Sequence, residues 1–229
     1  MADEAPLATH TFAVLGCGGL GVPAAWTLAL ARVARLVLID DDRVEPSNLH
    51  RQVLYTEADA GRAKAEVLAD HLRGRFPDTI FEARCARADA GSVAAVLSGC
   101  AAVIEGSDDA ECKFVVNDWA SLWRGRDRRV CIAAAIGRRG QWMVVEPEGA
   151  CYRCLFEEPP PPETLASCRV AGVLGPVVGL AGAFAARALL RSVRGEEDPA
   201  RSALVRVQPD GWHRTVVDPA ADCGCQRRS

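Results

Sequence analysis

The sequence is poor in lysine, in aromatic residues and in net charge. Lys64 and Lys113 are the two lysines among the 27 basic residues of the 229-residue chain, and the other 25 are arginines. With a formal net charge of −3, bulk charge does not drive the chain onto nucleic acid or an anionic membrane. Aromatic residues make up 6%, whereas 20 glycines and a 49% share of hydrophobic residues indicate one substantial core packed from small side chains.

The N-terminus lacks the features of a secretory signal, because MADEAPLATH contains acidic residues and no apolar core. The ten cysteines therefore indicate metal or thiol chemistry in a reducing compartment, and we expect a cytoplasmic protein. An apolar stretch at 170–186 approaches the length of a membrane span, but glycines and a proline interrupt it. We expect a buried core helix there, and neither a membrane nor a nucleic-acid partner.

Apolar runs and glycine turns predict an α/β fold. Strands alternate with helical patterns through the first part of the chain, and such crossovers imply a parallel sheet. The fold class we expect is a single doubly wound, Rossmann-like domain with a mostly parallel sheet. The expected strands are 11–15, 36–39, 79–85, 101–105, 129–134, an antiparallel 141–146, 203–208 and 213–217; the expected helices are 22–33, 62–75, 92–97, 109–123 and 173–193.

A glycine-rich loop, GCGGLG at 16–21, lies between the first expected strand and helix. Its glycines Gly16, Gly18, Gly19 and Gly21 let the backbone turn tightly and approach a phosphate, while the helix start offers N–H groups to the anion. Asp40 ends the second strand, where an acid accepts hydrogen bonds from a ribose. The pattern predicts a nucleotide site without separating NAD from ATP; a structural glycine turn beside a solvated aspartate is the alternative.

Further motifs separate ATP from NAD. They are Asp40 and Asp42 at the strand end, SNLHRQ at 47–52, GRAKA at 61–65, GSDD at 106–109, CYRC at 151–154 and CRVAGVLGPVVG at 168–179. In this order and spacing the chain resembles the ThiF/MoeB/HesA family of adenylyltransferases, relatives of the ubiquitin-activating enzymes, over residues 11–225. An NAD-dependent oxidoreductase would leave 47–52 and 61–65 without an explanation.

The resemblance implies ATP-dependent adenylation of the C-terminal carboxylate of a small ubiquitin-like or sulfur-carrier protein with a Gly-Gly tail. Arg51 and Lys64 would face the phosphates of ATP, Asn48 would help to hold them, and Asp40 would bind the ribose. Asp108 would hold Mg²⁺, which prefers carboxylate and phosphate oxygens. Fixed cations and Mg²⁺ would then neutralise the charge on the phosphates during the reaction.

The scarcity of lysine supports the role of Lys64. A compact ammonium contacts a phosphate as a point charge, whereas a planar guanidinium needs a site of a different shape. Lys113 faces either the same pocket or solvent. Asp42 belongs to the expected nucleotide-binding set, but an aspartate here serves equally well as a turn or helix cap.

A CxxC pair, Cys151 and Cys154, and a CxC pair, Cys223 and Cys225, supply four thiolates, and such a set suits tetrahedral Zn²⁺. Free or redox-active thiols are the alternative. Zinc would tie the C-terminal extension to the middle of the chain. We expect one adenylation domain over 1–229, with a nucleotide-binding part at 1–147 and a zinc-tied, carrier-binding part at 148–229.

Cys168 begins the CRVAGVLGP motif and has Arg169 beside it, a setting that lowers a thiol pKa. The resemblance implies that Cys168 transfers the activated carrier; a buried or bystander thiol is the alternative. We expect the remaining five cysteines to be small core residues. They are Cys17, Cys85, Cys100, Cys112 and Cys131.

The chain departs from the family pattern at its N-terminus. Family members begin with a helical segment whose arginine reaches ATP, often across a dimer interface, whereas the ten residues before Thr11 include neither arginine nor lysine. Either the site does without this cation, Arg43 replaces it, or a partner chain in a homodimer or a heteromeric complex supplies it. A non-catalytic or partner-dependent subunit of a heterodimeric activating enzyme is therefore the first alternative function, and an NAD-dependent oxidoreductase is the second.

Overall fold

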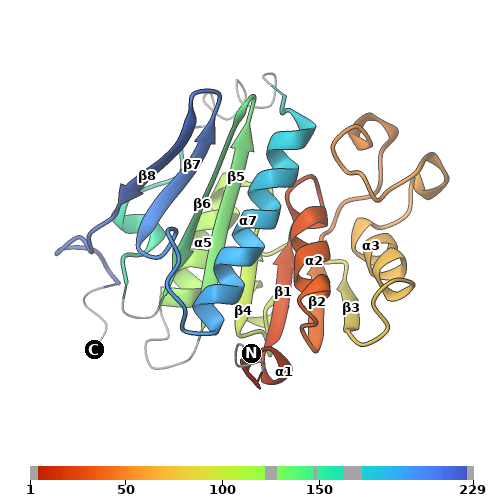
Figure 1. The fold of residues 1–229 in the computed structure, drawn as a ribbon, viewed down its shortest axis with the longest axis horizontal. Coiled ribbons are helices and arrows are strands. Elements are labelled where there is room, and N and C mark those ends of the chain that lie inside the picture. Colours follow the sequence, from red (N-terminus) through yellow and green to blue (C-terminus); the bar gives the residue numbers. More distant parts are fainter. Residues whose placement is uncertain (1–4, 122–127, 147–148, 162–171, 226–229) are drawn as a thin grey trace.

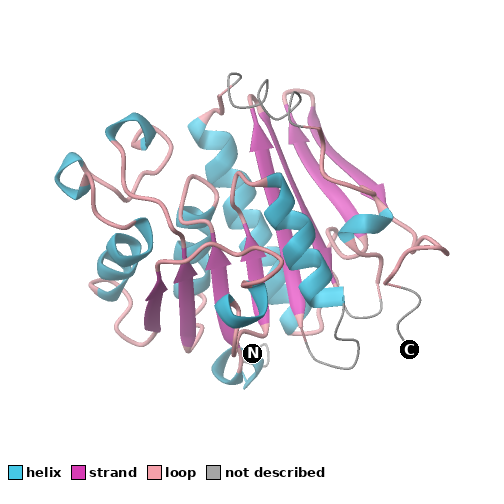
Figure 2. Cartoon of the chain, turned by 180° about the vertical axis from the view of Figure 1, so that it is seen from behind, coloured by secondary structure: helices cyan, strands magenta, loops and turns pink. Residues whose placement is uncertain are grey.

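The structure, a computed structural model, describes residues 5–121, 128–146, 149–161 and 172–225. They form an eight-stranded sheet in the order β3-β2-β1-β4-β5-β6-β7-β8 (Figures 1 and 2). The first five strands of that order are parallel, and β6 to β8 are antiparallel additions. The strands are β1 Thr11–Leu15, β2 Arg35–Ile39, β3 Ile80–Arg84, β4 Ala102–Glu105, β5 Arg129–Ile136, β6 Arg139–Val145, β7 Ala203–Gln208 and β8 Gly211–Val216.

Helices cover both faces of the parallel part of the sheet. One face carries α1 Ala5–Thr9, α2 Gly21–Leu30, α3 Lys64–Arg73 and α7 Gly175–Val193, and the other carries α4 Val93–Val96 and α5 Ala110–Ser121. Figure 1 shows α2 and α7 side by side in front of the sheet, with α5 behind it. Three short 3₁₀ turns, η1 Pro46–Asn48, η2 Glu57–Asp59 and η3 Tyr152–Cys154, lie in the connections.

The strands are continuously apolar because both of their faces are buried. In β1, Phe12 and Val14 pack into the core beneath α2 and α7, whereas Ala13 and Leu15 pack into the core beneath α5. Successive side chains of a strand point to opposite faces, so a two-sided sheet selects an uninterrupted apolar run such as TFAVL. The expected α/β fold with a mostly parallel sheet is confirmed.

Helix α7 contains residues 175–186 of the apolar stretch that approached the length of a membrane span. By length and composition alone it could cross a membrane, but 56% of its apolar window is buried inside the protein. Its small residues allow close packing on α2: a Cβ added at Gly182 would lie 2.2 Å from the carbonyl oxygen of Leu20. The expectation of a core helix is confirmed, and its described start is Gly175 rather than residue 173.

Candidate functional site

The glycine loop follows β1, at the point where the order of the parallel strands reverses. From β1 the chain crosses one face through α2, and from β4 it crosses the other face through α5, so β1 and β4 flank the switch point at which doubly wound sheets bind ligands. Gly16 has a φ of +88°, and a Cβ there would lie 2.6 Å from the backbone nitrogen of Ser107. Glycine at 16 therefore lets the loop after β1 touch the loop after β4.

The SNLHRQ segment packs on the same glycine loop. A Cβ at Gly19 would lie 3.3 Å from the carbonyl oxygen of Arg51, and one at Gly18 would lie 3.3 Å from Nε2 of Gln52. The Arg51 guanidinium donates a hydrogen bond to Oδ1 of Asn48. The structure thus places the two expected phosphate-binding side chains, Asn48 and Arg51, together beside the glycine loop.

Asp40 fastens the glycine loop to the end of β2. Its carboxylate accepts hydrogen bonds from the backbone N–H of Cys17 at 2.6 Å and of Asp42 at 2.8 Å. Burial raises the pKa of Asp40, while the nearby Lys64 ammonium and these two N–H groups act in the opposite direction. Asp40 is therefore a part-buried carboxylate at the place where a ribose is expected.

Lys64 is the first residue of α3 and is buried, with 5% of its surface exposed. Its ammonium donates to Oδ2 of Asp42 at 2.7 Å, the one acceptor that the described part of the chain gives it. Tyr55 is buried between the two motifs, with its hydroxyl 2.6 Å from the carbonyl oxygen of Cys17 and 3.3 Å from that of Lys64. Lys64 thus lies beside the glycine loop and keeps donors for an anion.

The two aspartates of GSDD have different environments. Asp109 accepts hydrogen bonds from the backbone N–H of Glu111 and Cys112, so it caps the start of α5, and it also pairs with Arg87. Asp108 is exposed at the end of β4 and has no hydrogen-bond or ion-pair partner within the described ranges. Its carboxylate is therefore available to a hard cation such as Mg²⁺.

The sequence motifs did not predict the ion pair between Glu105 and Lys113. The Lys113 ammonium donates to Glu105 at 2.6 Å, to the Ser107 carbonyl at 2.8 Å and to the Ala133 carbonyl at 2.9 Å. Lys113 is therefore buried in an ion pair, and the alternative that it faces solvent was wrong. Its sequence signal was slight: an acid ending the apolar strand AVIE and a lysine within the apolar helix start ECKFVV.

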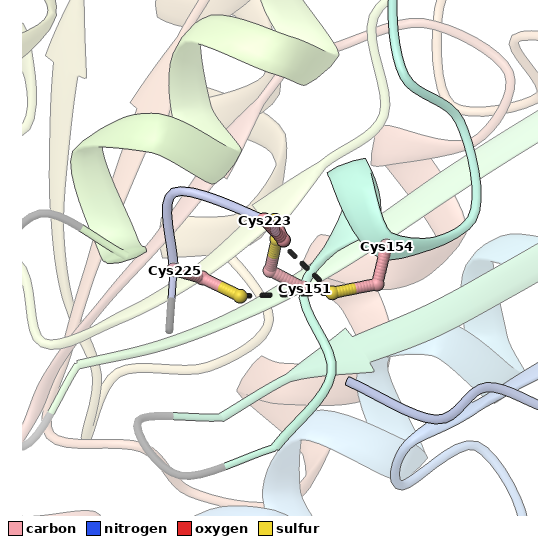
Figure 3. A group of neighbouring side chains, drawn as sticks. All are labelled: Cys151, Cys154, Cys223 and Cys225. Carbon is pink, nitrogen blue, oxygen red and sulfur yellow. Dashed lines mark hydrogen bonds between the residues drawn. The ribbon is translucent and has the colours of Figure 1, made fainter. Parts of the chain in front are cut away.

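The four expected zinc ligands come together from distant parts of the sequence, and Figure 3 shows their side chains converging. The sulfur atoms of Cys151 and Cys223 are 3.6 Å apart, those of Cys154 and Cys225 are 3.6 Å apart, and those of Cys151 and Cys154 are 3.9 Å apart. Tetrahedral Zn²⁺ with Zn–S bonds of about 2.3 Å separates its sulfurs by about 3.8 Å. The donor set fits a structural zinc.

The other cysteines divide differently from the expectation. Cys17, Cys100, Cys112 and Cys131 are buried as expected, but Cys85 is exposed. The expectation for Cys85 was wrong because β3 ends at Arg84, so Cys85 follows the strand instead of filling its core face. Cys168, the expected nucleophile, lies outside the described residues.

The fold is of the doubly wound α/β class, and its glycine loop is flanked by one segment that carries Arg51 and another that carries Lys64. The model of the ThiF family matches residues 2–226, so the chain belongs to the ThiF family. It is 37% identical to the sulfur carrier protein ThiS adenylyltransferase of Escherichia coli over 92% of this chain and 83% of that protein. It is 39% identical to the SAMP-activating enzyme E1 of Haloferax volcanii over 80% of this chain and 67% of that enzyme.

Several similar proteins are longer than this chain. The mouse adenylyltransferase and sulfurtransferase MOCS3 is 42% identical over 82% of this chain, which spans only 41% of the length of MOCS3. Among solved structures, E. coli MccB with ATP covers 98% of this chain, with a TM-score of 0.83 and 19% sequence identity. At that identity the likeness to MccB shows the shared fold.

Proposed function

We propose that this protein adenylates the C-terminal carboxylate of a small ubiquitin-like or sulfur-carrier protein with ATP. One observation carries the proposal: the glycine loop, Asp40, Lys64, the Asn48–Arg51 pair and Asp108 lie together at the carboxyl ends of β1, β2 and β4. The proposal is further supported by relatives that are named as adenylyltransferases or activating enzymes.

The reaction needs positioning and charge neutralisation. A carboxylate oxygen of the carrier attacks the α-phosphorus of ATP, the bond to the bridging oxygen breaks, and pyrophosphate leaves with the electron pair. Arg51 and Lys64 would counter the phosphate charge, Asp40 would accept hydrogen bonds from the ribose, and Asp108 would hold Mg²⁺, which supplies further positive charge when bound. Asp42, now paired with Lys64, would give up that ammonium when the phosphates bind.

A non-catalytic subunit of an activating complex is the second candidate. The short helix α1, which was not expected, precedes β1 but contains no basic residue. Arg43 donates to the carbonyl of Gly61 in the GRAKA segment at 2.7 Å, so it is a candidate for a replacement cation. Retention of Asn48, Arg51, Lys64 and Asp108 nevertheless favours a catalytic protein.

We infer that the N-terminal and C-terminal parts of the chain have separate roles. We propose that 1–147 binds the nucleotide and that 148–229, tied by zinc on Cys151, Cys154, Cys223 and Cys225, receives the carrier with its Gly-Gly tail. The thiolate of Cys168 would then attack the carbonyl carbon of the adenylated carrier and expel AMP, so that the acyl group of the carrier is linked to sulfur. The protein would work in the cytoplasm, where thiols stay reduced, as a homodimer or within a heteromeric complex that supplies the N-terminal cation.

The test is carrier-dependent ATP–pyrophosphate exchange with a panel of small sulfur-carrier and ubiquitin-like proteins that end in Gly-Gly. We expect exchange with at least one carrier, and a loss of about 100-fold or more in Lys64→Ala and Asp108→Ala, because each removes a group that neutralises or holds charge. Asp78→Ala, which changes an exposed carboxylate just before β3, at the amino end of the strands, is the matched control and should leave exchange unchanged.

Exchange that persists in Lys64→Ala and Asp108→Ala would refute the proposed site. Absence of exchange with every carrier would favour the non-catalytic subunit instead. The two results are distinguishable because the first retains activity and the second has none in the unmodified chain.

A further inference from the structure

Glu105, the last residue of β4, and Lys113 of α5 form a buried ion pair. Glu105 is 0% exposed and Lys113 is 7% exposed, and their charged atoms are 2.6 Å apart. Burial raises the pKa of Glu105, and the ammonium of Lys113 opposes that rise. Two charges are removed from water only at a cost, so each must find polar partners in the interior.

Those partners belong to the loop that carries Asp108. Glu105 Oε1 accepts hydrogen bonds from both the backbone N–H and the hydroxyl of Ser107. Lys113 donates to the Ser107 carbonyl from the opposite side and to the Ala133 carbonyl of β5. Ser107 is thus held through both its backbone N–H and its backbone carbonyl, and the next residue is the exposed Asp108.

The held loop also touches the glycine loop. The backbone N–H of Gly106 donates to the Leu15 carbonyl at 2.8 Å, and Gly16 approaches Ser107 so closely that a Cβ would clash with it. A shift of Ser107 would therefore move Asp108 relative to the place where phosphates approach the backbone.

Lys113 has no capacity left to bind a ligand itself. An ammonium has three donors, and Glu105, Ser107 and Ala133 take all three. We propose that the buried Glu105–Lys113 pair is a positioning device that fixes the 106–108 loop and so aims the Asp108 carboxylate at the metal–nucleotide complex. This inference rests on the proposed adenylation.

The first test removes each partner with little change of volume, in Lys113→Met and Glu105→Gln. Because small misplacements of a reacting group are costly, we expect kcat for ATP–pyrophosphate exchange to fall by about 10- to 100-fold, with KM for ATP nearly unchanged. We also expect a higher Mg²⁺ concentration at half-maximal activity, because Asp108 no longer points in one direction.

The second test needs no activity. Hydrogen exchange of the ligand-free variants, followed on peptides that span 103–111, should be faster than in the unmodified chain, because the Ser107 N–H loses a restrained acceptor. Lys113→Arg keeps the charge and several donors, and it should restore part of the protection and part of kcat.

The matched control is Asp198→Asn, which also disturbs a buried carboxylate paired with arginines, near the C-terminal end of α7. Asp198→Asn should lower Tm without changing the Mg²⁺ concentration at half-maximal activity or the hydrogen exchange of peptides that span 103–111.

The inference is overturned if Glu105→Gln and Lys113→Met are folded yet retain normal kcat, a normal Mg²⁺ midpoint and normal protection from hydrogen exchange. It is also overturned if Asp198→Asn changes these three quantities equally. If the unmodified chain shows no ATP–pyrophosphate exchange with any carrier, the proposed function fails. The hydrogen-exchange measurement still tests whether the Glu105–Lys113 pair fixes the 106–108 loop.

Discussion

Lys64 and Lys113, the two lysines of the chain, are both buried against a carboxylate, yet they differ in what remains available to a ligand. Lys113 has all three donors occupied, whereas Lys64 donates to Asp42 alone among the described residues. The scarcity of lysine singled out both positions, but only the three-dimensional contacts separate an ammonium that keeps donors for a ligand from one whose donors are all occupied.

We expect the raised pKa of Asp40 to make nucleotide binding sensitive to pH. The folded protein holds the Asp40 proton more tightly than an exposed aspartate does, because burial disfavours the carboxylate. Ionised Asp40 therefore costs stability at neutral pH, and this cost disappears as the pH falls through the raised folded-state pKa. Protonation over the same range removes the acceptor that would bind the ribose. As the pH is lowered, ATP affinity should therefore begin to decrease at a higher pH than the one at which an ordinary aspartate titrates.

Calorimetric titration with ATP between pH 4.5 and 8 tests this prediction. At neutral pH Asp40→Asn should weaken ATP binding by about tenfold, since hydrogen bonds to charged groups contribute about 1.5–3 kcal/mol. The difference between Asp40→Asn and the unmodified chain should shrink as the pH falls. Asp70→Asn, at an exposed carboxylate on α3, should titrate like the unmodified chain. A constant difference at every pH would contradict the prediction.

At the scale of elements, periodicity and glycine turns predicted the strands closely, since the expected 11–15 and 203–208 agree with β1 and β7. Helix ends were less exact: α3 begins at Lys64 rather than 62, because Ala63 is still extended before the first turn. The Glu105–Lys113 pair joins a strand end to a helix, and no local pattern reports which charged residues meet across two elements.

The close contact between α2 and α7 requires a residue without a side chain at position 182. A methyl group at Gly182 would meet the Leu20 carbonyl oxygen at 2.2 Å and Cγ of Pro23 at 2.8 Å. Gly182→Ala should therefore push α7 away from α2 and destabilise the protein by about 1–3 kcal/mol, the usual cost of overpacking. ATP binding should weaken too, because Leu20 belongs to the glycine loop.

Gly179, on the same helix, provides the matched control. A Cβ at Gly179 would meet no atom within 4 Å, so Gly179→Ala gains helix propensity of about 1 kcal/mol without a clash. Thermal unfolding should show a lower Tm for Gly182→Ala and an equal or higher Tm for Gly179→Ala. Equal decreases in the two variants would show that α7 tolerates no side chain there for a reason other than its packing on α2.

At the scale of the whole molecule, the four-cysteine cluster joins two segments about 70 residues apart, Cys151 and Cys223 being separated by 72 positions. Both segments pack into the core beneath α5, together with Tyr152 of η3 and Val217 after β8. Sequence spacing predicted the ligand set, because CxxC and CxC pairs carry their own chelating geometry. It did not predict the neighbouring layers, since burial depends on how β7 and β8 extend the sheet.

Zinc bound at this cluster would restrain the C-terminal segment against the sheet. We expect close to one zinc per chain in protein purified without chelator. Removal of zinc by a chelator, or the double change Cys223→Ser with Cys225→Ser, should destabilise the protein by about 3 kcal/mol or more, because metal binding and folding are coupled. Proteolysis should then cut first within 218–225, where the restraint is lost.

The exposed Cys85 separates metal binding from general thiol effects. Cys85→Ser should keep the zinc content and the protease resistance of the unmodified chain, because its thiol lies outside the cluster. Elemental analysis, Tm and the rate of C-terminal cleavage should change together in the Cys223/Cys225 variant and not in Cys85→Ser. Metal-free protein with an unchanged Tm and an uncut C-terminal segment would instead mean that the apolar contacts of Tyr152 and Val217 hold this region without a metal.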